Sequence, residues 1–156
     1  MQRREFLTVF MGALATVVLP IHALAGLLHQ TWNKTAFEAT KLDEAIKGLN
    51  VSTETSSKDI EPSKNIEIAA PDRAENGAVV QIEITSNITN TESITVLVEH
   101  NPTPLIGTFR FSNGALPFVI TRIKMAEDSD LKVIVKAGGQ YFTASKKVVV
   151  LENGCG

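Results

Sequence analysis

The sequence predicts a mainly β protein, an immunoglobulin-like antiparallel β-sandwich with an N-terminal helix and a flexible C-terminal arm. Two observations predict it. From Ile66 onward, short apolar runs, several of them alternating with polar residues, recur at roughly regular spacing. Between them lie clusters of Gly, Pro, Asn, Asp and Ser, which are typical of turns. A chain of 156 residues with 44% hydrophobic and 21% charged residues has room for one globular domain.

Six or seven strands follow from this alternation, enough for a sandwich of two sheets. The expected strands span residues 66–68, 78–85, 93–99, 108–111, 118–125, 131–136 and 141–151. Gly138 and Gly139 separate the last two strands, so these should form a hairpin. Residues 100–104 are expected to form a loop rather than part of a central strand, because Pro102 and Pro104 cannot donate ladder hydrogen bonds.

One helix is expected before the sandwich. Phe37, Leu42, Ala45, Ile46 and Leu49 fall near one helical face, with charged residues on the other. This predicts a helix over residues 35–47 that ends at Gly48 and packs its apolar face on the domain. The polar stretch 50–65 is interpreted as a linker.

Residues 1–25 have the features of a twin-arginine export signal. Arg3 and Arg4 precede an apolar stretch that reaches Leu24, and 23–25 reads Ala-Leu-Ala, a cleavage pattern. Gln2 and Thr8 depart from the usual signal pattern. A membrane anchor is the alternative, but Pro20 and the cleavage pattern close the apolar run. We therefore expect a mature periplasmic protein that starts near Gly26 and has no stable membrane association.

Charge and residue types argue against several functions. A net charge of −2 gives no reason to expect a nucleic-acid partner. His29, His100 and Cys155 lie in unrelated settings, which predicts no metal site, and no motif for a cofactor is evident. His100 lies in a loop with no evident partner and is interpreted as a surface residue rather than an acid or base.

The most unusual feature is Cys155, the single cysteine of the chain. It follows the last expected strand, and Asn153, Gly154 and Gly156 around it suit a flexible tip. We interpret 26–151 as the domain and 152–156 as a swinging arm. Measured from Val150, an extended chain would carry Cys155 about 17 Å out, at about 3.4 Å per residue.

A free cysteine has a pKa of about 8.5, and the neighbouring carboxylates would raise the pKa of Cys155 further. Such an unassisted thiol suits a carrier activated inside other proteins' sites, not a catalyst. Two alternatives remain. The chain could be an exported binding or structural module whose cysteine only cross-links chains. It could also be a redox-sensing thiol, which would require a lowered thiol pKa.

Several segments resemble one known family. They are the twin-arginine signal, the 37–49 helix, and residues 70–80, 97–102, 121–125 and 135–139. The tail Asn153-Gly154-Cys155-Gly156 is similar to the family pattern Gly-Gly-Cys-Gly-Gly, with Asn153 in place of the first glycine and no glycine after Gly156. The chain thus resembles the SoxY family, the sulfur-carrier subunit of the bacterial Sox thiosulfate-oxidising system.

The resemblance implies a carrier rather than an enzyme. Cys155 would be the covalent attachment site for thiosulfate, loaded by a c-type cytochrome enzyme. A hydrolase would then release sulfate, and a sulfane dehydrogenase, where present, would oxidise the remaining sulfur. The family works as a heterodimer with SoxZ, a small β-sandwich subunit exported while bound. The 102–104 loop and the helix are both candidate SoxZ-binding faces, and Asn153 could alter how the arm fits partner enzymes.

Overall fold

The structure is a computed structural model, and it describes residues 33–49, 60–112 and 114–152. The predicted export signal, most of the predicted linker and residues 153–156 lie outside the described residues. The described part contains two short helices and nine strands. No helix among these residues is both long enough and apolar enough to cross a membrane.

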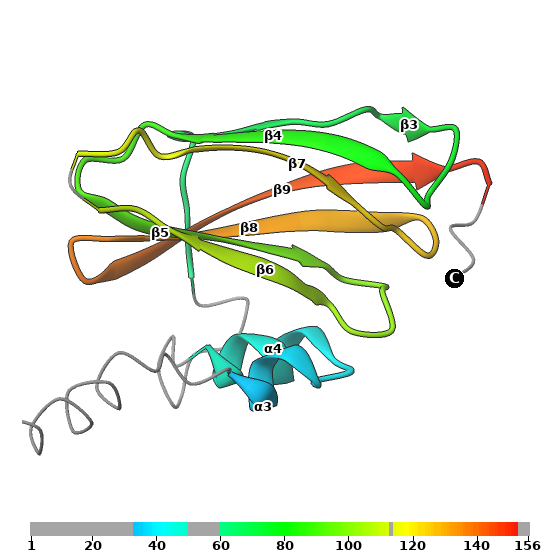
Figure 1. The fold of residues 1–156 in the computed structure, drawn as a ribbon, viewed down its shortest axis with the longest axis horizontal. Coiled ribbons are helices and arrows are strands. Elements are labelled where there is room, and N and C mark those ends of the chain that lie inside the picture. The colour runs from blue at the N-terminus through cyan, green and yellow to red at the C-terminus, as the bar shows by residue number, and fades with distance from the viewer. Residues whose placement is uncertain (1–32, 50–59, 113, 153–156) are drawn as a thin grey trace, which may run out of the picture. The chain divides into compact units, whose positions relative to one another are not determined.

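Two sheets face each other, as the alternation predicted (Figure 1). The larger sheet has the order β1-β9-β8-β5-β6, with β3 also paired to β9, and the smaller has the order β2-β4-β7. The strands are β1 (Glu61–Pro62), β2 (Ile66–Ala69), β3 (Arg73–Ala74), β4 (Val80–Ser86), β5 (Thr91–Val98), β6 (Leu105–Arg110), β7 (Phe118–Ile123), β8 (Ser129–Ala137) and β9 (Gln140–Val150).

The main core fills the space between the sheets. Alternate residues of β4 (Val80, Ile82 and Ile84) point inward and are buried, and β8 contributes alternate residues in the same way. β5 is buried without alternation from Ile94 to Val98, because its other face is also covered. Leu97 of β5 and Ile134 of β8 belong to a second apolar cluster on the outside of the larger sheet.

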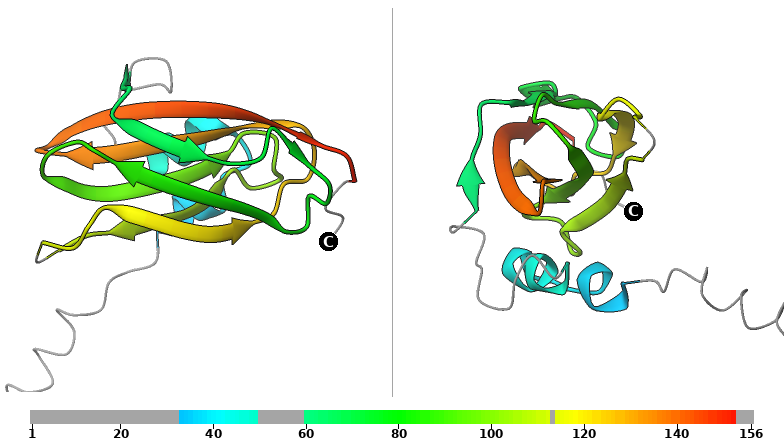
Figure 2. Two further views of the ribbon diagram at one scale, coloured as in Figure 1. Left: turned by 90° about the horizontal axis from the view of Figure 1, so that it is seen from above. Right: turned by 90° about the vertical axis from the view of Figure 1, so that its left-hand side faces the viewer.

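The helices form that cover, and here the prediction of one helix over 35–47 is wrong. Two helices are present, α3 (Lys34–Phe37) and α4 (Leu42–Gly48), and they lie against the larger sheet (Figure 2). Asn33 accepts a hydrogen bond from the Ala36 N–H at 3.2 Å through its Oδ1, and its Nδ2 donates to the Gly48 carbonyl at 2.6 Å. This side chain joins the start of α3 to the end of α4, so the chain folds back as a hairpin.

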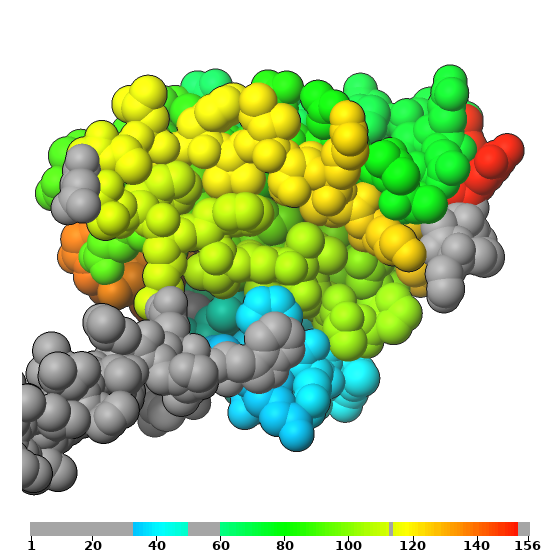
Figure 3. Space-filling view, in the orientation of Figure 1, coloured from blue at the N-terminus to red at the C-terminus, as the bar shows by residue number. Residues whose placement is uncertain are grey.

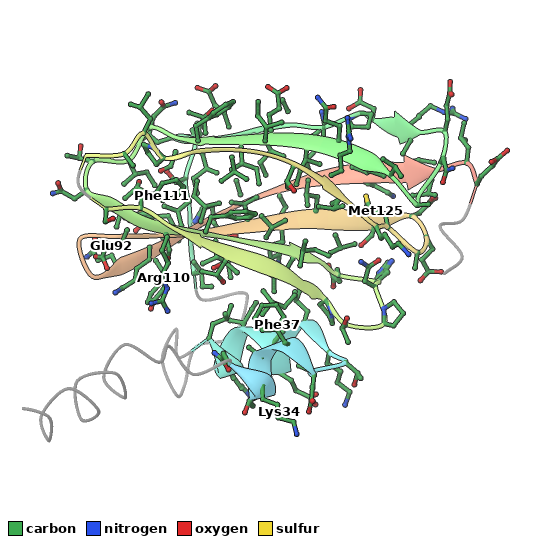
Figure 4. All side chains as sticks on the ribbon, viewed as in Figure 1. Lys34, Phe37, Glu92, Arg110, Phe111 and Met125 are labelled. Atoms are coloured by element: carbon green, nitrogen blue, oxygen red, sulfur yellow. The ribbon has the colours of Figure 1, made fainter. Side chains whose placement is uncertain are left out.

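Gly48 allows this hairpin to close. A Cβ atom at Gly48 would lie 2.7 Å from the Ala36 Cα and 2.8 Å from the Ala36 nitrogen, closer than real Cβ contacts. Gly48 is the last residue of α4 rather than a residue beyond its end, and its missing side chain lets the helices touch. Phe37 points from the hairpin toward the sheet, whereas Lys34 points away (Figure 4).

Several strand boundaries differ from the prediction. β6 begins at Leu105, directly after Pro104, three residues earlier than expected. β1 and β3 have two residues each and pair in parallel with β9, so no alternation could reveal them. The hairpin between β8 and β9 is confirmed. Gly138 and Gly139 have φ values of +56° and +77°, which suit the two central positions of a type I′ turn.

Candidate functional site

The predicted site residues Asn153, Gly154, Cys155 and Gly156 lie outside the described residues. The structure does describe how the chain leads into them. β9 ends at Val150, and Leu151 and Glu152, which we call the arm root, follow it. The loops after β3, β5 and β7 lie at the same end of the sandwich as the arm root (Figure 1).

Residues 72–77 hold the arm root by backbone hydrogen bonds. The N–H groups of Val149 and Leu151 donate to the carbonyls of Asp72 and Ala74, at 3.0 and 2.9 Å. The Glu152 N–H donates to the Glu75 carbonyl at 3.2 Å, and the Gly77 N–H donates to the Glu152 carbonyl at 2.9 Å. Figure 3 shows the end of β9 lying against this segment. Glu152, predicted to be the first residue of the arm, is thus bonded through both backbone groups.

The loop between β7 and β8 forms hydrogen bonds both to the 72–77 segment and to the end of β9. The Met125 N–H donates to the Gly77 carbonyl at 2.8 Å, and the Met125 side chain is fully buried. Figure 4 shows Met125 in the interior at this end of the sandwich. From the same loop, a carboxylate oxygen of Asp128 accepts the Val150 N–H at 2.6 Å. The last residues of β9 therefore have fixed partners on both sides.

His100 has partners that the sequence did not reveal. Its Nδ1 lies 2.7 Å from the Asp128 carbonyl, and its backbone N–H donates to the Ser129 hydroxyl at 3.0 Å. A carbonyl can only accept, so Nδ1 carries the proton in this contact. A Glu127 carboxylate oxygen lies 3.9 Å from the same nitrogen. His100 therefore helps position the loop whose Asp128 holds β9.

Asn101 ties the same two loops together. Its Nδ2 donates to the Lys124 carbonyl, and its Oδ1 accepts the Ala126 N–H, both at 2.8 Å. Neither Asn101 nor Asp128 was singled out as a site residue from the sequence. Their partners lie more than 20 residues away in the chain, so local patterns carry no signal. Only the family resemblance pointed to this region, through its segments 97–102 and 121–125.

Acidic side chains predominate around the arm root. Glu75, Glu99, Glu127 and Glu152 are exposed here, against the exposed cations Arg73 and Lys124, and Asp72 is exposed but forms an ion pair with Lys146 at 3.1 Å. Negative charge at this end disfavours ionisation of a nearby thiol. Within the described ranges, no group of three His, Cys, Asp or Glu side chains is arranged to hold a metal ion. The surroundings of the arm root suit the holding of a chain rather than the activation of a nucleophile.

Three segments of the family resemblance meet at this end, namely 70–80, 97–102 and 121–125, whereas 135–139 includes the hairpin at the other end. Comparison with known proteins agrees. The family described as "Sulfur oxidation protein SoxY" matches residues 52–155. The solved structure of the sulfur carrier protein SoxY from Chlorobium limicola f thiosulfatophilum is 34% identical, with a TM-score of 0.60. The match covers 77% of this chain and all of that one.

A more distant likeness concerns the fold alone. A candidate superoxide reductase from Thermotoga maritima has a TM-score of 0.52 at 19% identity, over 62% of this chain and 98% of that one. No curated protein sequence matches the chain. The family match covers most of this chain, and the alignment with the Chlorobium protein covers the whole of that chain. The chain belongs to the SoxY family of sulfur-carrier proteins.

Proposed function

We propose that this protein is a periplasmic sulfur carrier, not an enzyme, and that Cys155 holds thiosulfate-derived intermediates covalently. Membership of the SoxY family is the observation that carries the proposal. The geometry of the arm root supports it. The chain is held on the sandwich as far as Glu152, and Cys155 follows three residues later.

The proposed loading step joins two sulfur atoms. The thiolate of Cys155 and thiosulfate form a new S–S bond, and the two electrons released pass to a c-type cytochrome. The product is a cysteine S-thiosulfonate. A hydrolase then adds water across the bond between the outer two sulfur atoms. Sulfate and two protons leave, and a persulfide stays on Cys155. A sulfane dehydrogenase would oxidise that remaining sulfur.

The proposed assembly is a heterodimer with a SoxZ-type β-sandwich subunit, exported together by the twin-arginine route. Contacts with the cytochrome, the hydrolase and the dehydrogenase are transient. The carrier needs no cofactor of its own for this chemistry, because the oxidant and the hydrolytic site belong to the partner enzymes. Of the two faces considered for SoxZ, the apolar side of the helical hairpin already packs on this chain's own sheet.

A Cys155→Ser variant tests the proposal. We expect wild-type carrier, supplied with the Sox enzymes and thiosulfate, to support reduction of cytochrome c, and the variant to support none. The serine hydroxyl cannot form the S–S bond, while the fold is unaffected by a change outside the sandwich. Undiminished cytochrome reduction with the variant would contradict the carrier function and favour a module whose cysteine only cross-links chains.

A further inference from the structure

Five large apolar side chains are exposed among the described residues, and they form two groups. Leu116, Phe118 and Ile120 are 83%, 45% and 58% exposed and lie on or just before β7. Val79 and Leu151 are 60% and 52% exposed and both belong to the surroundings of the arm root. We call Val79 and Leu151 the collar, since each flanks the hydrogen bond between Gly77 and Glu152.

Val79 follows a turn at Asn76 that is closed by two hydrogen bonds. The Asn76 carbonyl accepts the Val79 N–H at 3.4 Å, and the Asn76 side-chain Oδ1 accepts the Ala78 N–H at 2.7 Å. The next residue, Val80, begins β4 and is buried in the core. Alternation along the strand therefore directs Val79 to the surface. Leu151 is fixed by its N–H bond to the Ala74 carbonyl.

Chain length limits where a partner enzyme can receive Cys155. Three residues beyond Glu152 reach at most about 10 Å, at about 3.4 Å per residue. This is shorter than the about 17 Å expected when the arm was measured from Val150. A pocket that takes up Cys155 must therefore open within this distance of Glu152, so its rim must approach Leu151 and Val79.

We propose that the collar is a docking surface for the pocket rim of the sulfate-releasing hydrolase, and that this rim is apolar at its centre and basic at its edge. The inference rests on the proposed carrier function. Burying Val79 and Leu151 would provide the apolar centre of the contact. The exposed carboxylates Glu75, Glu127 and Glu152 outnumber the exposed cations Arg73 and Lys124 at this end, and this excess would meet cationic side chains. A second copy of this chain fits less well, because a two-fold contact here would bring like charges together.

Four carriers test the inference, each purified as the mature heterodimer with its SoxZ-type subunit. They are wild type, Val79→Ser with Leu151→Ser, Leu116→Ser, and Cys155→Ser as the unloaded blank. Leu116 is a matched control, since it is the same residue type as Leu151 and more exposed, but lies before β7. Tetrathionate loads the carriers, because the Cys155 thiolate displaces thiosulfate from it and leaves the S-thiosulfonate.

Sulfate release by the hydrolase is then measured against carrier concentration. We expect the double variant to raise KM about tenfold with kcat unchanged, because the collar contributes to docking and not to hydrolysis. The Leu116→Ser carrier should match wild type. Iodoacetamide should alkylate Cys155 at the same rate in all three thiol-containing carriers, and sedimentation should show the same assembly.

Other results would overturn the inference. An unchanged KM in the double variant would do so, as would an equal rise in KM with Leu116→Ser. Faster alkylation of the double variant would mean that the chain's own tail covers the collar. Loss of a larger assembly would mean that a second copy covers it. If wild-type carrier fails to load or to release sulfate, the carrier function itself is contradicted, and the inference with it.

Discussion

Gly48 is the residue whose replacement should most directly disturb the helical hairpin. A Cβ there would meet backbone atoms of Ala36 at 2.7 and 2.8 Å, and a backbone cannot give way as a flexible side chain can. We expect Gly48→Ala to lower the free energy of unfolding by about 1–3 kcal/mol, as overpacking does elsewhere. Chemical denaturation followed by circular dichroism measures this change.

Gly107 supplies the control. It lies in β6, and an added Cβ would meet no atom within 4 Å. Gly107→Ala should therefore leave stability unchanged or raise it slightly, because alanine has less backbone freedom to lose on folding. Equal destabilisation by both substitutions would show that the close approach to Ala36 is not the cause.

Cys155 should behave as an unactivated thiol in the free protein. The described end of the sandwich carries exposed Glu75, Glu127 and Glu152, and negative charge disfavours the thiolate. We expect its rate of alkylation to rise with pH with a midpoint at or above about 8.5. A midpoint near or below neutral pH would instead favour a redox-sensing thiol.

Single residues were the hardest scale to predict. The sequence identified Cys155 because it is unique, and it drew attention to Gly48 and His100. It could not assign their roles, since Gly48 is explained by its contact with Ala36 and His100 by the carbonyl of Asp128. Such partners depend on the three-dimensional arrangement. Asn101 and Asp128 gave no local signal for the same reason.

At the scale of elements, the hairpin between β8 and β9 is tied to β5 by an ion pair. Lys136 Nζ lies 2.6 Å from a Glu92 carboxylate oxygen, and the Gly139 N–H donates to Glu92 at 3.1 Å. The hydrogen bond from Lys136, and then that from Gly139, lowers the pKa of Glu92 below its ordinary value of 4.5. The hydrogen bond to Glu92 raises the pKa of Lys136 above 10.5.

These directions set the pH range in which the pair stabilises the fold. The Glu92 part is present above about pH 4.5 and is lost as pH falls through its lowered pKa. The Lys136 part is present below about pH 10.5 and is lost as pH rises through its raised pKa. A Glu92→Gln variant should melt slightly below wild type at pH 7, and the gap should narrow as pH falls below about 4.5 and through the lowered pKa of Glu92. A gap of the same size at pH 3 would contradict this account.

The contact between the β7–β8 loop and β9 can be tested through Asp128. Its carboxylate accepts the Val150 N–H, so Asp128→Ala should expose this amide and speed its hydrogen exchange about fivefold to tenfold, as losing one hydrogen bond does. Asp128→Asn keeps an acceptor oxygen and should exchange at close to the wild-type rate. Exchange rates that are equal in all three proteins would mean that this bond does not hold the end of β9.

Elements with a strong period were predicted well, and those that depend on distant pairing were not. The alternation in β4 identified it as a strand, the apolar runs of β5 and β8 between turn residues identified those two, and the two glycines located the hairpin between β8 and β9. β1 and β3 have two residues each and exist only through pairing with β9. The helical pattern over 35–47 was real in its apolar spacing, but the helix ends at Phe37 and a second one begins at Leu42. The Asn33 bond to Gly48, 15 residues away, joins the outer ends of the two helices and has no local signal in the sequence.

For the whole molecule, the fold class and family followed from sequence because both depend on many residues together. The position of the arm root did not, because it depends on how the 72–77 segment and the β7–β8 loop meet β9. This arrangement leaves Cys155 three residues from a fixed point at one end of the sandwich. Under the proposed carrier function, this short tether is what would let one small domain offer a bound group to several enzymes in turn.

If Cys155 carries thiosulfate-derived sulfur, the intact mass of the mature protein must show it. The protein is purified without reductant from cells oxidising thiosulfate, and fragmentation locates any adduct. We predict additions of thiosulfate or of extra sulfur atoms on Cys155, and none on a Cys155→Ser variant from the same cells. A bare thiol in all of the wild-type protein, or the same additions on the variant, would contradict the carrier function.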